Sequence, residues 1–202
     1  ILQAKRQSAP AQINFPRDYF TQVIDIDLPA VVEFERPSGG NDAMAEAAAL
    51  LSGAKFPVIL NGAGVVIGGA ISASMKLAER LDAPVCVGYQ HNDAFPGSHP
   101  LFAGPLGYNG SKAGMELIQK ADVVLALGTR LNPFSTLPGY GLDYWPKEAK
   151  VIQVDINPNR IGLTKRVAVG IVGDARKVAE GILARLGDHA AEAGRAERKA
   201  LI

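Results

Sequence analysis

Short, nearly uninterrupted apolar runs recur along this chain, and polar or glycine-rich turns separate them. The runs that predict β-strands are 58–60, 84–87, 123–127, 151–154 and 167–172. Uninterrupted apolar runs are typical of strands that are buried on both faces of a parallel sheet. Because helical segments lie between the runs, the pattern predicts an α/β fold: a doubly wound parallel sheet of five or six strands.

The segments between these runs carry helix signals. Asn41-Asp42 supplies an N-cap for an alanine- and leucine-rich helix, and apolar positions at helical spacing predict a second helix at about 69–81. Another helix is expected at 112–119, and a final helix that Asp174 caps ends near residue 186. Helices and strands therefore alternate along most of the chain.

Three of the predicted strands end in a glycine or polar turn. The first ends in Gly62-Ala63-Gly64, the third in Gly128-Thr129-Arg130 and the fourth in Asp155. Glycine allows the backbone to turn tightly and to approach a ligand, and the N–H groups at a following helix start can receive an anion. The candidate cofactor-binding residues for a nucleotide-like ligand are therefore Gly62, Gly64, Gly128, Arg130 and Asp155.

Four of these residues also have a purely structural interpretation. Gly62 and Gly64 could serve a tight turn that needs positive φ and holds no ligand. Asp155 could hydrogen-bond a ribose or adenine group, or it could cap the turn at Asn157-Pro158. Arg130 could pair with a diphosphate or with a carboxylate across the sheet. The residues alone leave these alternatives open.

The chain divides by composition into three parts. Residues 1–40 combine an expected strand at 11–15 with a linker that contains proline and glycine. Residues 41–187 hold the alternating strands and helices, and residues 188–202 are expected to form an exit helix or linker. Because the first residue is Ile1 rather than Met, we expect the sequence to be a piece of a longer protein.

Composition argues against several classes of protein. The 202 residues carry a net charge of +1 without a basic stripe, so no nucleic-acid partner is expected. Cys86 is the single cysteine, which fits a cytoplasmic protein. No apolar stretch approaches the length of about 18–20 residues that spans a membrane. His91 and His99 have no ordered carboxylates around them, so no metal site is expected.

Three motifs, taken in order, resemble one enzyme family. They are Gly62-Ala63-Gly64, Ala-Asp-Val-Val-Leu-Ala-Leu-Gly-Thr-Arg-Leu at 121–131 and Val-Ile-Gln-Val-Asp-Ile-Asn-Pro at 151–158. Together with Gly173-Asp174-Ala175, this set is similar to the central domain of thiamine-diphosphate-dependent enzymes of the acetolactate synthase group. The resemblance implies that the α/β part is such a central domain. It also implies that residues 10–18 are the last strand of a preceding, pyrimidine-binding domain.

The long region between the second and third predicted strands, residues 88–110, shows which enzymes of this group the chain resembles most. Residues 88–100 and 104–110 resemble sulfoacetaldehyde acetyltransferases, which convert sulfoacetaldehyde and phosphate into acetyl phosphate and sulfite with thiamine diphosphate and magnesium. Acetolactate synthases usually have Met and His where this chain has Tyr108 and Asn109. The resemblance implies that this region lies near an active site or a domain interface. Its candidate substrate or interface residues are His91, Asn92, Tyr108 and Asn109.

The catalytic groups of the family are not expected in this chain. By the resemblance, a glutamate in the preceding domain activates the cofactor, and a Gly-Asp-Gly…Asn motif in the following domain holds its diphosphate and magnesium. This chain has no Gly-Asp-Gly, and Glu33, Glu35 and Glu46 fall in the linker or the first helix. We expect no catalytic residue and no activity in the fragment itself. Its expected partners are the remaining domains, further copies in a dimer or tetramer, and a small-molecule substrate.

The resemblance leaves an alternative function open. Relatives of the acetolactate synthase and oxalyl-CoA decarboxylase type hold FAD or ADP in this domain. The chain could therefore be a structural module that binds a nucleotide. FAD, ADP and no ligand all remain alternatives for this domain.

Overall fold

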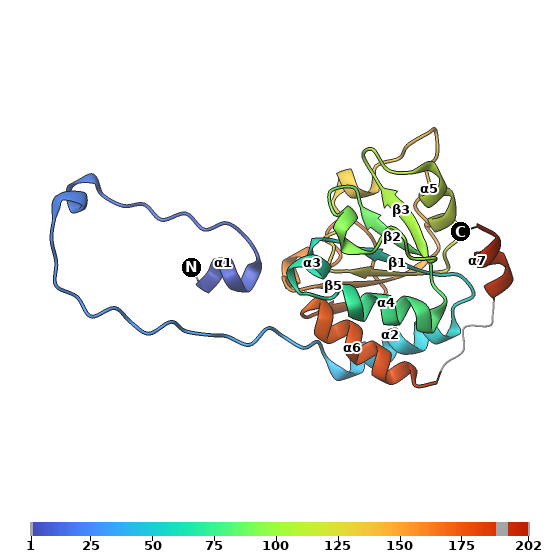
Figure 1. The fold of residues 1–202 in the computed structure, drawn as a ribbon, viewed down its shortest axis with the longest axis horizontal. Coiled ribbons are helices and arrows are strands. Elements are labelled where there is room, and N and C mark those ends of the chain that lie inside the picture. The colour runs from blue at the N-terminus through green and yellow to red at the C-terminus, as the bar shows by residue number, and fades with distance from the viewer. Residues whose placement is uncertain (1, 189–193, 202) are drawn as a thin grey trace.

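The computed structural model describes residues 2–188 and 194–201, and within them six strands form one sheet (Figure 1). The strands are β1 (Pro57–Asn61), β2 (Val85–Gly88), β3 (Phe102–Leu106), β4 (Val123–Leu127), β5 (Lys150–Asp155) and β6 (Val169–Val172). Their order is β3-β2-β1-β4-β5-β6, and neighbouring strands are parallel throughout. The predicted doubly wound sheet is confirmed. The strand order reverses between β1 and β4, which is where such sheets bind their ligands.

Helices cover both faces of this sheet. α2 (Asn41–Gly53), α4 (Ile71–Leu81) and α6 (Ala175–Leu186) form a layer on one face, and α5 (Lys112–Ile118) lies on the other (Figure 1). A short helix, α3 (Ala63–Ile67), follows β1 directly. The other described helices and 3-10 turns are α1 (Leu2–Gln7), α7 (Arg195–Leu201), η1 (Arg17–Thr21), η2 (Asn92–Ala94), η3 (Pro133–Thr136) and η4 (Pro158–Arg160).

The central strands β1 and β4 are buried at every position. Successive side chains of a strand point to opposite faces, so each strand contributes to two clusters. Ile59 and Leu125 pack with the layer of α2, α4 and α6, whereas Leu60 and Val124 pack with α5 and with Tyr144. This burial on both faces explains why the strands appear in the sequence as uninterrupted apolar runs.

Two elements differ from the sequence prediction. β3 lies inside the region 88–110, which is predicted to be a long loop because it is rich in glycine, proline, histidine and aromatic residues, and Pro105 falls within the strand. Proline is tolerated there because β3 is an edge strand, and one side of it makes no ladder hydrogen bonds. α2 begins at Asn41 with Gly40 in the N-cap position, and the Asn41 side chain instead accepts a hydrogen bond from Arg185 at 2.9 Å.

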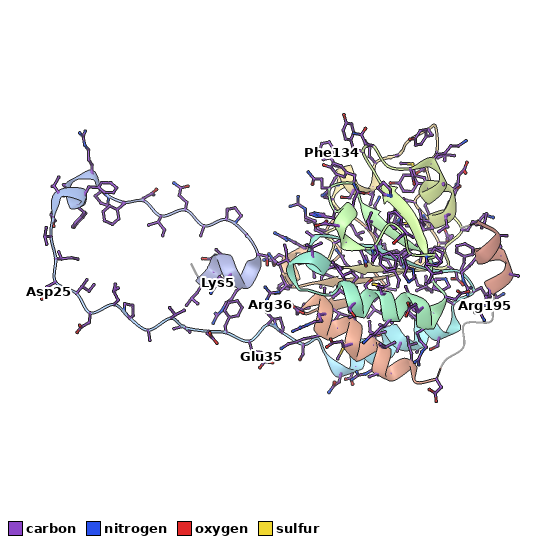
Figure 2. All side chains as sticks on the ribbon, viewed as in Figure 1. Lys5, Asp25, Glu35, Arg36, Phe134 and Arg195 are labelled. Atoms are coloured by element: carbon purple, nitrogen blue, oxygen red, sulfur yellow. The ribbon has the colours of Figure 1, made fainter. Side chains whose placement is uncertain are left out.

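Residues 2–40 lie largely outside the layered unit. Between α1 and α2 the chain runs as a wide loop, and the part of it that carries Asp25 lies far from the layers, whereas Arg36 lies where the loop meets them (Figure 2). The strand expected at 11–15 is wrong: within the described chain these residues pair with no strand, and isolated strands are not stable in water. The loop returns to the sheet at Ser38, which forms an antiparallel bridge with Gly173.

The exit segment expected at 188–202 is described only in part, because 189–193 and 202 lie outside the described residues. α7 packs back against the layered unit, and the Arg198 Nε donates a hydrogen bond to Asp82 O at 2.9 Å. Within residues 2–188 and 194–201, no helix is both long and apolar enough to cross a membrane.

Candidate ligand site

The turns that follow β1 and β4 touch each other at the carboxyl edge of the sheet. The Gly62 N–H donates to Leu127 O at 3.0 Å, and the Gly64 N–H donates to Gly128 O at 2.8 Å. A Cβ atom on Gly64 would lie 2.7 Å from Gly128 Cα, and one on Gly62 would lie 2.5 Å from Thr129 Cβ. Side chains at these positions would therefore push the two turns apart.

The conformations of these glycines correct one structural interpretation of the sequence. Gly62 has φ −123°, and Gly64 lies inside the right-handed helix α3, so neither residue has the positive φ that was expected. Gly128 does have a positive φ, of +60°. Close contact between two turns, rather than a left-handed backbone, is therefore the reason for glycine at 62 and 64.

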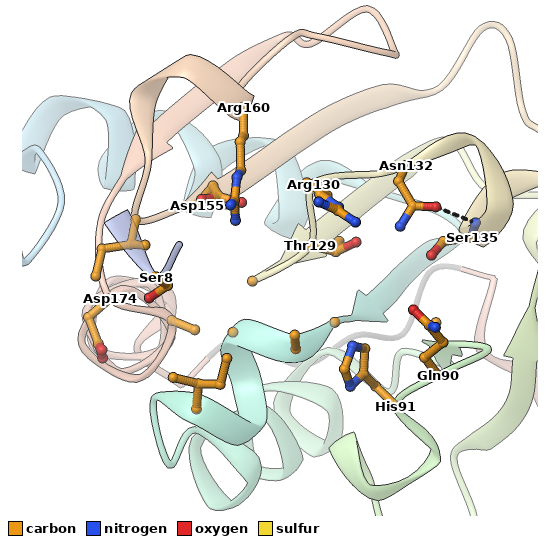
Figure 3. A pocket seen from close by; sticks show the side chains of 18 of the residues that line it. Ser8, Gln90, His91, Thr129, Arg130, Asn132, Ser135, Asp155, Arg160 and Asp174 are labelled. Atoms are coloured by element: carbon orange, nitrogen blue, oxygen red, sulfur yellow. Dashed lines mark hydrogen bonds between the residues drawn. The ribbon is translucent and has the colours of Figure 1, made fainter. Parts of the chain in front are cut away.

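A cavity of about 310 Å³ opens at this edge of the sheet, beside the reversal of strand order (Figure 3). The five candidate cofactor-binding residues, Gly62, Gly64, Gly128, Arg130 and Asp155, all line it. Further residues that line it are Ser8, Arg36, Ile67, Gln90, His91, Thr129, Asn132, Ser135, Ile156, Arg160 and Asp174.

The two ends of the cavity differ in chemistry. Asp155, Arg160 and Asp174 lie toward one end, whereas His91 and Asn132 lie toward the other (Figure 3). A ligand that extends along the sheet edge would meet ionic groups at one end. It would meet amide and imidazole groups at the other.

Asp155 is a buried carboxylate at the end of β5, with only 6% of the residue exposed. Burial raises the pKa of its carboxyl, while the N–H of Asn157 and the charges of Arg160 and Arg130 act in the opposite direction. One carboxylate oxygen, Oδ1, accepts the Asn157 N–H at 2.8 Å, so Asp155 caps the following turn. The same residue lines the cavity, so the turn-capping role and a ligand contact are compatible.

Gln153 holds together the two turns that carry Arg130 and Arg160. Its side chain is buried, and Nε2 donates to Thr129 O and to Arg160 O, each at 3.2 Å. Its Oε1 accepts the Gly162 N–H at 2.8 Å. One amide group therefore fixes the spacing between the turns from which both guanidinium groups project.

The second group of sequence candidates does not gather around the cavity. His91 lines it, but Asn92, Tyr108 and Asn109 do not. Tyr108 is 54% exposed, and its ring lies edge-on to that of Tyr89 with centroids 6.1 Å apart. Asn92 and Asn109 are also exposed. Their assignment as substrate or interface residues stays a prediction.

Sequence reasoning missed three charged residues of the cavity, namely Arg36, Arg160 and Asp174. Arg160 had a usable signal, because it lies in the turn directly after Asp155. Asp174 was taken as a helix cap, which is confirmed, since its Oδ1 accepts the N–H groups of the first turn of α6. Arg36 lies in the expected linker and had no local signal.

Comparison with known proteins identifies the family. Residues 44–182 match the family model described as thiamine pyrophosphate enzyme, central domain. The match covers well over half of the chain, and the chain therefore belongs to this family. The resemblance inferred from the three motifs is confirmed.

Two relatives show where the chain falls within this family. It is 80% identical over 202 residues to the sulfoacetaldehyde acetyltransferase of Roseovarius nubinhibens, which covers 100% of this chain and 34% of that protein. It is 36% identical over 184 residues to the probable acetolactate synthase large subunit of Methanocaldococcus jannaschii, which covers 88% of this chain and 31% of that protein. The chain thus spans about a third of the length of these curated relatives.

A solved structure shows the same fold. The benzoylformate decarboxylase from Polynucleobacter necessarius superposes with a TM-score of 0.69 over 86% of this chain and 32% of its own. Sequence identity in this match is 24%, so the likeness concerns the fold alone.

Proposed function

We propose that this chain is the central domain of a thiamine-diphosphate-dependent enzyme that converts sulfoacetaldehyde and phosphate into acetyl phosphate and sulfite. The observation that carries the proposal is the 80% identity over the whole chain to a sulfoacetaldehyde acetyltransferase, against 36% to an acetolactate synthase subunit. The resemblance of residues 88–100 and 104–110 to the acetyltransferases supports the same substrate.

The proposal also assigns the parts of the chain. Residues 41–187 are the central domain, residues 1–40 are the end of the pyrimidine-binding domain with its linker, and residues 188–202 lead out of the central domain. The whole enzyme is a cytoplasmic dimer or tetramer. The exposed apolar side chains of residues 11–34 support this division, because a preceding domain would cover them.

The described residues of this chain do not suit the magnesium ion that accompanies thiamine diphosphate in this family. Residues 2–188 and 194–201 contain no group of three His, Cys, Asp or Glu side chains that could hold a metal ion. The two acidic residues of the cavity already have partners, because Asp155 accepts the Asn157 N–H and Asp174 pairs with Arg36. We therefore assign the cofactor, its magnesium ion and the catalytic groups to the other domains of the full-length enzyme.

An assay of the full-length enzyme tests the substrate. The enzyme is incubated with thiamine diphosphate, magnesium, phosphate and sulfoacetaldehyde, and sulfite and acetyl phosphate are both measured. We expect equal amounts of the two products, and no acetyl phosphate when phosphate is left out. Conversion of pyruvate into acetolactate without any release of sulfite would keep the family and contradict the substrate.

A second function of this chain is to bind a nucleotide in the cavity. The cavity lies where doubly wound sheets bind ligands, and three guanidinium groups face two carboxylates in its lining. Its volume of about 310 Å³ is at the low end of small-molecule pockets, about 300–1,000 Å³, which favours ADP over the larger FAD. Equilibrium binding of ADP and FAD to the 202-residue chain tests this, and a yellow protein with tightly bound flavin would contradict the preference for ADP.

A further inference from the structure

We propose that Arg36 is a binding residue for a phosphate group in the cavity, so that a bound ligand holds the junction segment (residues 35–40) against the central domain. This inference rests on the second proposed function, nucleotide binding in the cavity, and adds a residue and a consequence to it. It does not depend on the identity of the substrate of the full-length enzyme.

The junction segment is attached to the start of α6 by its backbone. The Asp174 N–H donates to Pro37 O at 2.8 Å, and Lys177 Nζ donates to Arg36 O at 3.0 Å. Ser38 forms the antiparallel bridge with Gly173. These contacts place the segment at the rim of the cavity, where the loop of residues 2–40 meets the layered unit (Figure 2).

The Arg36 side chain is fixed at this rim but keeps donors for a ligand. Its Nη1 donates to Asp174 Oδ2 at 2.9 Å and approaches Ile67 O at 3.5 Å. Among the described residues, no hydrogen bond uses its Nε or Nη2, and the side chain is 37% exposed. Guanidinium groups bind phosphate through two parallel N–H groups, so a second pair of donors on Arg36 is what a phosphate requires.

The charges around the cavity favour an anion there. Arg36, Arg130 and Arg160 contribute three positive charges, and Asp155 and Asp174 contribute at most two negative charges. The Asp174 carboxylate is engaged on both oxygens, by the first turn of α6 and by Arg36. The lining therefore has a net positive charge that a phosphate would neutralise.

The position of Arg36 joins ligand binding to the attachment of the chain that carries it. Arg36 can contact a ligand in the cavity only while the junction segment is docked. Docking of the segment and binding of the ligand therefore stabilise each other. Coupling of this kind is reciprocal, and it typically changes each equilibrium by a factor of about 5–150. A bound ligand should therefore stabilise the docking of the junction segment, and the loss of the Arg36 side chain should lower the affinity for the ligand.

Two measurements on the 202-residue chain test the proposal together. Calorimetry gives the dissociation constant of ADP and, separately, of inorganic pyrophosphate, and amide hydrogen exchange reports on residues 35–40 with and without each probe. We expect saturating ADP to slow exchange of the junction segment about tenfold. Arg36→Ala should weaken the binding of ADP about tenfold and abolish the ligand-dependent slowing of exchange. Arg36→Lys should give values between those of Arg36→Ala and of the unchanged chain.

Arg17→Ala is the matched control, because it removes the same charge from the same N-terminal part at an exposed position that does not line the cavity. It should leave both readouts unchanged. Pyrophosphate that reproduces the dependence on Arg36 would support the phosphate group as the element recognised. Equal ADP affinity in Arg36→Ala, exchange of 35–40 that ignores the ligand, or no binding of either probe would overturn the proposal. Absence of any binding would also contradict the second proposed function, whereas ADP binding that does not depend on Arg36 would contradict this proposal alone, and neither result would affect the sulfite assay.

Discussion

Residues 11–34 and the central strands β1 and β4 are both rich in apolar side chains, yet they have opposite environments. Val23, Leu28 and Val31 are 99%, 87% and 82% exposed, whereas Ile59 and Leu125 are completely buried. The residue types are alike, so composition does not cause the difference. The strands lie between two helical layers, and residues 11–34 lie outside them (Figure 1).

This contrast shows that an apolar run forms a stable strand only when other elements pack against its side chains and a neighbouring strand pairs with its backbone. Within the described chain, no backbone N–H of residues 23–34 donates a hydrogen bond. Little there offsets the conformational entropy of ordering, which is about 1–2 kcal/mol per residue for the backbone. The fold is therefore expected to depend on residues 41–187, and the following substitutions test that expectation.

The largest difference is expected between two leucines. Leu125→Ala removes a buried side chain from β4, and we expect it to lower the free energy of unfolding by about 2–5 kcal/mol. Leu28→Ala, at an exposed site, should change it by less than about 0.5 kcal/mol. Urea unfolding measures both, and similar losses would contradict the contrast between the regions.

Gly128→Ala tests the contact between the two turns at the cavity. Its φ of +60° and a Cβ only 2.7 Å from Gly64 Cα should together cost about 3 kcal/mol of unfolding free energy. Gly141→Ala is the control, because Gly141 has φ +73° and, apart from its two chain neighbours, no described residue has an atom within 4 Å of an added Cβ. It should lose only about 1 kcal/mol, from the backbone term alone. Equal losses would mean that the contact between the turns is unimportant.

A smaller effect is expected at the start of α5. The Ser111 side chain accepts the Gly114 N–H at 3.0 Å and so caps this helix. Ser111→Ala should lower the unfolding free energy by about 1 kcal/mol. Ser98→Ala, at an exposed position, should be neutral in the same unfolding experiment, and a loss at Ser98 as large as that at Ser111 would argue against the cap.

The smallest effect concerns Asp155 and depends on pH. Burial raises the pKa of this carboxyl, so the folded protein binds the proton more tightly than the unfolded chain and holds the charged form at a cost. The cost is present above the raised pKa and disappears below the ordinary value of 3.8. Asp155→Asn should therefore raise Tm at pH 7 by about 2 °C, and the gain should shrink as the pH falls toward that value. Asp25→Asn, at an exposed position, should leave Tm at pH 7 unchanged, and a lower Tm for Asp155→Asn at pH 7 would contradict the account.

The sequence was most informative where one local pattern decides the structure. β4 has the predicted bounds, and Asp174 caps α6 as expected, because both signals lie within a few adjacent residues. β3 was missed because the region 88–110 is rich in glycine and proline, which mark loops, and its place at the edge of the sheet, where a proline is tolerated, is not visible in the sequence. The strand at 11–15 was predicted from its pattern, which does not show whether a partner strand is present.

Some residues of the candidate site could likewise be predicted from local sequence patterns, and others could not. Glycine turns and Asp155 follow predicted strands directly, and parallel strands bring their carboxyl ends to one edge, so these residues could be found together. Arg36 reaches the cavity only through the path of the junction segment, and Gln153 acts from inside a strand whose pattern is otherwise apolar. Neither arrangement is visible in the order of residues along the chain.

Amide hydrogen exchange over the whole chain tests most directly whether the fold depends on residues 41–187. We expect the amides of β1 and β4 to exchange only through global unfolding, and those of residues 23–34 to exchange at rates close to those of an unstructured peptide. Strong protection of residues 23–34, comparable with that of the central strands, would contradict the account, because it would show that this segment has a folded environment of its own within the chain.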